Sequence, residues 1–186
     1  MAMALQRQRV TAEQFDDFIQ QPDLGDRVFE FVGGEIIEMP SNPYSSKISQ
    51  MIAGEIYIFL KGKKLGHLTG EAGLYRVGGE RYAPDVGYIS RDKQAELAHS
   101  GPNPNPPDLA VEVISDEGSV TEIDQLMLKV SNYVAAGTAV WVVYPQTKAV
   151  RVHVPGQPVQ IIGLDGTLDG GTALPGFVLP LRDIFE

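Results

Sequence analysis

The stretch Pro107-Asp-Leu-Ala-Val-Glu-Val-Ile-Ser115 has the composition of a buried β-strand and carries one carboxylate, Glu112, in its middle. An amphipathic helical pattern follows over residues 123–136, and a second apolar strand pattern over residues 139–144. Continuous apolar strands joined by a helix are typical of a sheet that is partly parallel and covered on both faces. The sequence therefore predicts an α/β domain with a mixed central sheet flanked by helices.

A second carboxylate, Asp85, lies in a similar apolar stretch, Tyr82-Ala-Pro-Asp-Val-Gly-Tyr-Ile-Ser90. Removing an unpaired carboxylate from water costs roughly several kcal/mol. Because the chain does this twice, we expect a cation between the two side chains, with a divalent metal as the leading candidate. Hard cations prefer oxygen ligands, which favours Mg²⁺, with Mn²⁺ as the alternative, and makes the backbone carbonyl of Val113 a further candidate ligand.

Lys129 is the candidate cationic side chain beside this metal. It lies in the helix that follows the Glu112 strand, with Gln125 and Tyr133 about one turn away on the same face. A metal of this kind can activate water and orient a phosphodiester. A nearby ammonium would hold the attacking water or screen the phosphate, so Lys129 is predicted to be catalytic together with Asp85 and Glu112.

Each of these residues also has a purely structural interpretation. Asp85 could cap a turn after Pro84 or accept from local backbone donors. Glu112 could belong to a buried ion pair, and Lys129 could be a solvated helix charge. Two further acids flank a predicted Gly-Gly turn, and either could complete the metal site. Of this pair we expect Glu35 to take part ahead of Glu30.

Composition narrows the range of functions. The chain has 186 residues with a formal net charge of −9, which is the wrong sign for a general nucleic-acid coat. Residues 47–76 nevertheless carry five basic residues against two acidic ones, so a local basic patch is available; its other interpretation is a cluster of cations at a helix C-terminus. With no Cys and three scattered His residues, a zinc site is not expected. No apolar run approaches membrane-spanning length, no secretory signal pattern is present, and a cytoplasmic location is expected.

Local patterns predict the remaining organisation. Residues 1–10 are expected to be a flexible lead and residues 11–186 one domain. The expected elements are a capped helix over 11–20, a hairpin over 28–39, a long helix from about 42 to 60, strands over 67–69, 72–77 and 82–89, a weak helix over 91–98, a Pro-rich loop over 101–107, strands at 149–154 and 159–164, and an extended apolar tail over 174–181 that packs on the body.

An ordered set of motifs resembles a known family. The set consists of Phe29-Glu-Phe-Val-Gly-Gly-Glu-Ile-Ile-Glu-Met-Pro40, Ala83-Pro-Asp-Val86, the Pro107–Ser115 stretch, Asp124 with Lys129, Tyr133 and Gly137, then Trp141, and finally Leu174-Pro-Gly-Phe177. In that order and spacing, over roughly residues 11 to 186, it resembles the Uma-type endonucleases, a branch of the PD-(D/E)XK nuclease superfamily.

The resemblance implies a restriction-endonuclease-like core and metal-dependent phosphodiester hydrolysis. It assigns Asp85 and Glu112 to the metal. The superfamily's usual Lys, two residues after the second carboxylate, is replaced here by Ile114. The resemblance implies that this Lys has moved to the following helix, in agreement with Lys129.

The leading hypothesis is an Mg²⁺-dependent endonuclease that acts on nucleic acid, with DNA expected in preference to RNA, as a symmetric homodimer. The acidic charge motivates a second hypothesis, a non-enzymatic binding or scaffold protein built on a nuclease fold. A third is a hydrolase of small phosphodiesters, whose substrates an acidic surface would repel less than a long polyanion.

Overall fold

The computed structural model describes residues 9–25, 27–39 and 42–186. The predicted flexible lead over residues 1–10 lies outside the described part except for its last two residues, and Val10 there donates a backbone hydrogen bond to Gly34. The helices are α1 (Ala12–Phe18), a 3-10 turn η1 (Pro22–Leu24), α2 (Pro43–Leu60), α3 (Val120–Ala135) and α4 (Arg182–Phe185). The described strands are β1 (Phe29–Val32), β2 (Glu35–Glu38), β3 (Gly66–Gly70), β4 (Tyr75–Val77), β5 (Glu80–Tyr82), β6 (Val86–Ser90), β7 (Leu109–Val113), β8 (Ala139–Tyr144), β9 (Ala149–His153), β10 (Gln160–Ile162), β11 (Thr167–Asp169) and β12 (Val178–Pro180).

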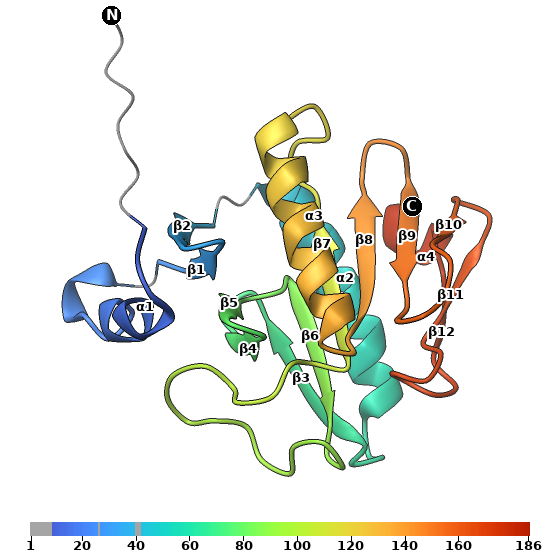
Figure 1. Cartoon of the computed structure of the whole chain (residues 1–186). Coiled ribbons are helices and arrows are strands. Elements are labelled where there is room, and N and C mark those ends of the chain that lie inside the picture. The colour runs from blue at the N-terminus through green and yellow to red at the C-terminus, as the bar shows by residue number, and fades with distance from the viewer. Residues whose placement is uncertain (1–8, 26, 40–41) are drawn as a thin grey trace, which may run out of the picture.

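A six-stranded sheet in the order β10-β9-β8-β7-β6-β3 forms the centre of the molecule (Figure 1). Its β7 and β8 strands are parallel and are joined by the crossover helix α3, whereas its other described neighbours are antiparallel. The predicted α/β fold with a mixed central sheet is therefore confirmed. A smaller sheet, β2-β1-β5-β4, and the β11-β12 hairpin complete the described strands.

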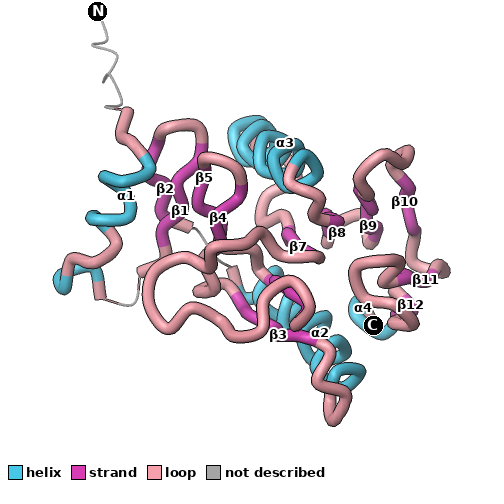
Figure 2. Tube along the Cα trace, turned by 60° about the horizontal axis from the view of Figure 1, so that its bottom comes forward, coloured by secondary structure: helices cyan, strands magenta, loops and turns pink. Residues whose placement is uncertain are grey.

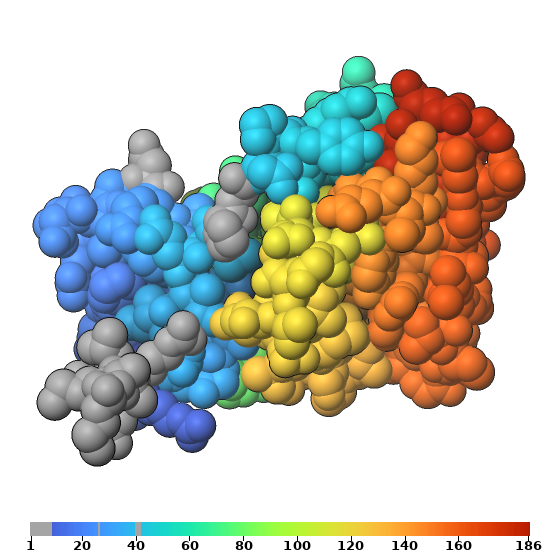
Figure 3. Space-filling view, turned by 90° about the horizontal axis from the view of Figure 1, so that it is seen from above, coloured from blue at the N-terminus to red at the C-terminus, as the bar shows by residue number. Residues whose placement is uncertain are grey.

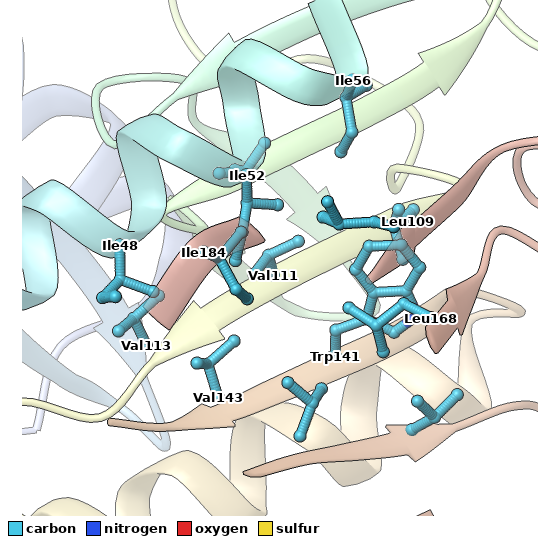
Figure 4. Close-up of a cluster of buried hydrophobic side chains, with 14 of the residues drawn as sticks. Ile48, Ile52, Ile56, Leu109, Val111, Val113, Trp141, Val143, Leu168 and Ile184 are labelled. Atoms are coloured by element: carbon cyan, nitrogen blue, oxygen red, sulfur yellow. The ribbon is translucent and has the colours of Figure 1, made fainter. Parts of the chain in front are cut away.

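The two long helices lie on opposite faces of the central sheet, as Figure 2 shows with the strands nearly end-on. Alternate residues of β7 divide between the two faces, because successive side chains of a strand point in opposite directions. Leu109, Val111 and Val113 pack in the cluster that contains Ile48, Ile52 and Ile56 of α2 (Figure 4). Ala110 and Ile114 pack in the cluster that contains Leu126, Val130 and Tyr133 of α3.

The predicted single strand over residues 82–89 is wrong. The chain instead leaves the small sheet after β5, passes through Ala83-Pro84-Asp85, and enters the central sheet as β6. Pro84 has no N–H to donate to a strand ladder, which favours a break at this point. The break places Asp85 at the junction of the two sheets.

The predicted weak helix over residues 91–98 is also wrong, because this segment forms turns. Side-chain hydrogen bonds hold it against the Pro-rich loop. The Asn103 Oδ1 atom accepts from Gln94 Nε2 at 2.9 Å and from the backbone N–H of Ala98 at 3.0 Å. Buried amide partners thus replace the helical backbone bonds that a weak pattern could not maintain.

Other local predictions are confirmed. Thr11 and Gln14 form the capping box of α1. Asn42 caps α2, which starts at Pro43. The tail packs on the body as predicted, with Phe177 stacked 6.1 Å from the Trp141 ring. Among the residues placed in the structure, no helix is long and apolar enough to cross a membrane.

Candidate active site

Strands β6 and β7 are antiparallel neighbours, and this pairing brings Asp85 and Glu112 to the same end of the sheet. Val86 is paired with Val111, so Asp85 lies one residue before β6 and Glu112 one residue further along β7. The Val113 backbone N–H donates to Asp85 Oδ2 at 2.6 Å. The predicted neighbourhood of the two carboxylate strands is therefore present.

Lys129 of α3 reaches the same place. Its ammonium donates to Glu112 Oε2 at 2.9 Å and to the two carboxylate oxygens of Glu30 at 2.8 and 3.0 Å. Lys129 is only 4% exposed, Glu112 5% and Glu30 1%, so this is a buried group of three charges. The amphipathic pattern of α3 explains the position, because Lys129 lies on the face that also buries Leu126 and Tyr133.

Glu30 is the site residue that the sequence ranked too low. It lies on β1, and its Oε1 atom also accepts from the backbone N–H of Ala83 at 2.7 Å. Glu35 begins β2 opposite Val32, nearer the hairpin turn, and does not line the cavity. The signal for Glu30 was present in the sequence: it stands between Phe29 and Phe31, the same acid-in-apolar pattern that identified Glu112.

These side chains line a cavity of about 260 Å³ between the small sheet, the end of β7 and the first turns of α3. Figure 3 looks down on this region, where the β1-β2 hairpin (blue) lies beside the start of α3 (yellow). The polar residues that line the cavity are Glu30, Asp85, Glu112, Ser115, Ser119, Thr121, Glu122, Gln125 and Lys129. Thr121 is exposed, so the cavity opens to solvent near the start of α3.

Burial is the largest influence on the electrostatics of the site. Burial raises the pKa of Asp85 to about 6, although the Val113 N–H and the Lys129 charge act in the opposite direction. Burial also raises the pKa of Glu112; Lys129 opposes this shift, whereas the charges of Glu30 and Asp85 add to it. The pKa of Lys129 is raised despite the cost of burial, because two carboxylates surround the ammonium. Two carboxylates bind the ammonium and a third, Asp85, is close enough to feel its charge, so the site carries excess negative charge whenever all three acids are ionised.

The carboxylate oxygens of the three acids differ in how many hydrogen bonds they accept. Glu112 Oε1 and the Tyr133 hydroxyl are both buried without a hydrogen bond of normal geometry, and burial together with the nearby Glu112 charge raises the pKa of that hydroxyl. In the described part of the chain, the one hydrogen bond to Asp85 is made to Oδ2. The N–H and C=O of one strand residue point to the same side, so the Val113 carbonyl faces the side on which Asp85 lies.

These atoms fit a divalent cation with oxygen ligands. Asp85 and Glu112 each keep a carboxylate oxygen without a hydrogen bond from the described residues, and the Val113 carbonyl is a third candidate oxygen. Mg²⁺ keeps several waters when a protein supplies few ligands. Within residues 9–25, 27–39 and 42–186, no group of three or more His, Cys, Asp or Glu side chains is placed to hold a metal by itself.

A mixed sheet between helices, with two acids on adjacent strand ends and a lysine beside them, defines the class of restriction-endonuclease-like proteins. Residues 15–182 match the model of the Uma2 family, described as "Putative restriction endonuclease". The chain therefore belongs to the Uma2 family, as the sequence motifs predicted.

A solved structure shows the same fold. The chain is similar to a protein from Anabaena variabilis ATCC 29413 described as a putative nuclease belonging to DUF820. The two share 20% sequence identity and superpose with a TM-score of 0.76, over 95% of this chain and 97% of the other. No curated protein matches this chain.

Proposed function

We propose that the protein is a metal-dependent endonuclease that hydrolyses phosphodiester bonds in nucleic acid. The observation that carries the proposal is a cavity that opens to solvent and is lined by Asp85, Glu112, Glu30 and Lys129, whose ammonium is paired with the two glutamates. Fold maintenance alone would favour apolar residues at such positions, because buried ion pairs contribute little net stability. Membership of the Uma2 family supports the same conclusion.

Asp85 and Glu112 would hold the cation, with the Val113 carbonyl as a third protein ligand. Mg²⁺ or Mn²⁺ bound there would supply a Lewis acid that lowers the pKa of water and offsets negative charge on the phosphate. The chain's own contribution is rigidity. Glu112 projects from a central strand, and the Val113 N–H fixes one oxygen of Asp85, so the other oxygen is presented at a defined position.

Lys129 orients Glu112. An ammonium has three N–H groups, and here all three have carboxylate partners, one on Glu112 and two on Glu30. In this arrangement Lys129 holds Glu112 Oε2 and leaves Glu112 Oε1 for the cation. Contact between Lys129 and a substrate phosphate would require one of these bonds to be exchanged.

The start of α3 offers the substrate phosphate its most favourable approach. Ser119 caps the helix and Thr121 lies in its first turn, and both line the cavity. The N-terminal end of a helix attracts anions through its free N–H groups and dipole. Glu122 in the same turn also lines the cavity and adds a negative charge, so the helix end offsets only a small part of the repulsion between a phosphodiester and the acids.

The finer parts of the proposal concern substrate and assembly. We expect DNA to be cleaved in preference to RNA, Mg²⁺ to be the working cation, and the active species to be a symmetric homodimer, because two sites are needed to cut both strands. Sedimentation of the purified protein with and without duplex DNA measures the assembly directly.

Cleavage assays with matched variants test the proposal. Supercoiled plasmid, single-stranded DNA, RNA and a chromogenic phosphodiester are incubated with protein and Mg²⁺, Mn²⁺ or EDTA. We expect metal-dependent plasmid cleavage that Asp85→Asn and Glu112→Gln each reduce by about 10³-fold or more, the scale on which one lost charge-stabilising group acts. Glu55→Gln, on the exposed face of α2, is the matched control and should cleave as the wild type does.

Three outcomes would count against an endonuclease. Cleavage that survives both site variants would come from a contaminant or another site. Hydrolysis of the chromogenic ester alone would favour the small-phosphodiester hypothesis, and no hydrolysis of any substrate would favour a binding protein on a nuclease fold.

A further inference from the structure

The third acid, Glu30, differs from the other two because both of its carboxylate oxygens already accept hydrogen bonds from the protein. Its Oε1 atom accepts from Lys129 at 2.8 Å and from the Ala83 backbone N–H at 2.7 Å, and its Oε2 atom accepts from Lys129 at 3.0 Å. By contrast, Glu112 Oε1 has no partner. The hydrogen bonding thus separates two acids that can bind a cation from one that is already committed to protein donors.

The two groups that Glu30 binds belong to two different parts of the site. Lys129 comes from α3, and Ala83 lies two residues before Asp85 in the segment that passes from the small sheet to the central sheet. A single side chain on β1 therefore connects the helix that carries the ammonium to the turn that carries the candidate ligand Asp85. No other side chain in the described residues makes hydrogen bonds to both.

Glu30 also holds the Lys129 ammonium in place when Glu112 binds a cation. A cation bound at Glu112 Oε1 would weaken the bond between Lys129 and Oε2 of the same carboxylate, because both partners are positive, and this bond could then be exchanged. Lys129 would then keep its two bonds to Glu30, and the third N–H would become available to water or to a phosphate oxygen. Without Glu30, the ammonium would have no fixed partner in that state.

We propose that Glu30 is a positioning residue that anchors Lys129 and the Asp85 turn during phosphodiester hydrolysis, and that it is not a metal ligand. This inference rests on the proposed function for its effect on turnover. It also makes claims about cation binding and about Lys129 that hold whether or not a substrate is cleaved.

The first experiment compares Glu30→Gln with Glu112→Gln, using the full chain. Mn²⁺ binding is measured by calorimetry, and kcat and KM are measured on the substrate that the wild type cleaves best. For Glu30→Gln we expect Mn²⁺ affinity within about threefold of wild type, KM little changed, and kcat lower by about 100-fold, as for small misplacements of catalytic groups. Glu112→Gln should lose most of its Mn²⁺ affinity, and Glu55→Gln should match the wild type throughout.

A loss of Mn²⁺ affinity in Glu30→Gln as large as that in Glu112→Gln would make Glu30 a ligand and overturn the inference. An unchanged kcat together with a lower Tm would show that Glu30 has only a structural role, and this result would also overturn the inference. Because Glu30→Gln leaves Lys129 with one carboxylate, its folding is checked by circular dichroism. The double variant Glu30→Gln/Lys129→Met removes both charges and supplies a second folded background.

The double variant tests whether Glu30 acts through Lys129. If it does, adding Glu30→Gln to Lys129→Met lowers kcat by no more than about twofold further, because groups that act as a unit are not additive. A further loss close to the full effect of the single variant would assign that effect to the Asp85 turn and overturn the anchoring of Lys129.

A readout without substrate separates this inference from the endonuclease proposal. The Lys129 NH₃⁺ signal in a ¹⁵N NMR spectrum, assigned by its loss in Lys129→Met, reports how firmly the ammonium is held. With saturating Mg²⁺ we expect the signal to persist in the wild type and to broaden in Glu30→Gln. Persistence in both would overturn the anchoring role, even if the protein cleaves DNA. Broadening in Glu30→Gln alone would support it, even if no substrate is cleaved.

Discussion

The two faces of strand β7 bury different kinds of side chain. On the α2 side, Leu109, Val111 and Val113 pack against isoleucines in a wholly apolar cluster. On the α3 side, Glu112 stands between Ala110 and Ile114 and shares a buried ammonium with Glu30. One face removes apolar area from water, whereas the other keeps charges out of water.

The difference shows where stability and function reside. Apolar burial is favourable in proportion to the area covered and tolerates modest changes of shape. A buried charge group is stable only while each member keeps its partners, so it responds sharply to the loss of one charge. The α3 face should therefore respond to ions and pH, and the α2 face should not.

The largest expected change in stability comes from removing the ammonium. Lys129→Ala leaves Glu30 and Glu112 buried together without a cation, and we expect the free energy of unfolding to fall by about 3–5 kcal/mol. Urea denaturation without metal measures it, with the exposed Lys47→Ala as control. Mg²⁺ should restore more stability to Lys129→Ala than to wild type. Equal Mg²⁺ effects on both would mean that the cation does not reach these acids.

A slightly smaller loss in the free energy of unfolding should follow from shortening an apolar side chain on the α2 face. Ile52→Ala opens a cavity beneath α2, and we expect a loss of about 3 kcal/mol. Because this cluster has no charged partner, the loss should be the same with and without Mg²⁺ and should vary little with pH. A Mg²⁺-dependent loss would show that the two faces are coupled through β7.

Asp85→Asn should stabilise the metal-free protein. The pKa of Asp85 is about 6 in the folded chain against an ordinary value of 3.8, so the ionised form is disfavoured by folding. Its removal at pH 7.5 should raise the free energy of unfolding by roughly 3 kcal/mol. The amide oxygen can still accept from the Val113 N–H. The same variant should lose the stabilisation that Mg²⁺ gives to wild type, and a destabilised variant would contradict the assigned charge state.

The sign of the pH dependence follows from the same shift. A raised carboxyl pKa contributes stability that is fully present below about 3.8 and is lost as the pH rises through about 6. Glu112, whose pKa is raised by burial, shifts stability in the same direction. Tm measured from pH 4.5 to 7.5 without metal should show this loss in wild type and a smaller one in Asp85→Asn.

The smallest effect should come from a position remote from both faces of β7. Thr11 caps α1 and forms the capping box with Gln14. Thr11→Ala should cost about 1 kcal/mol and leave Mn²⁺ affinity unchanged. A change in Mn²⁺ affinity would show that the N-terminal elements transmit strain to the cavity.

The sequence predicted the positions of those residues whose neighbours along the chain already indicate their environment in the fold. Glu112 and Asp85 were found because apolar neighbours along a strand mean burial in the sheet, and Lys129 because a crossover helix packs against the strand before it. The mixed sheet was predicted from the same strand and helix patterns, and the Uma2 family from the order and spacing of the motifs.

The parts that the sequence missed depend on contacts between distant segments. Glu30 meets Lys129 across 99 positions of the chain, and only the folded hairpin shows that it enters the cavity ahead of Glu35. The break between β5 and β6 was signalled by Pro84, but its outcome, a change of sheet, depends on the pairing of β5 with β1. The turns over residues 91–98 depend on Asn103, which lies in the loop beyond.

The β1-β2 hairpin has a consequence for engineering. Because Glu30 joins the cavity from this N-terminal part of the chain, a shortened variant that begins at α2 would keep Asp85, Glu112 and Lys129 and yet lack their anchor. Grafting the site onto another scaffold would likewise have to transfer a segment that carries neither of the candidate cation ligands.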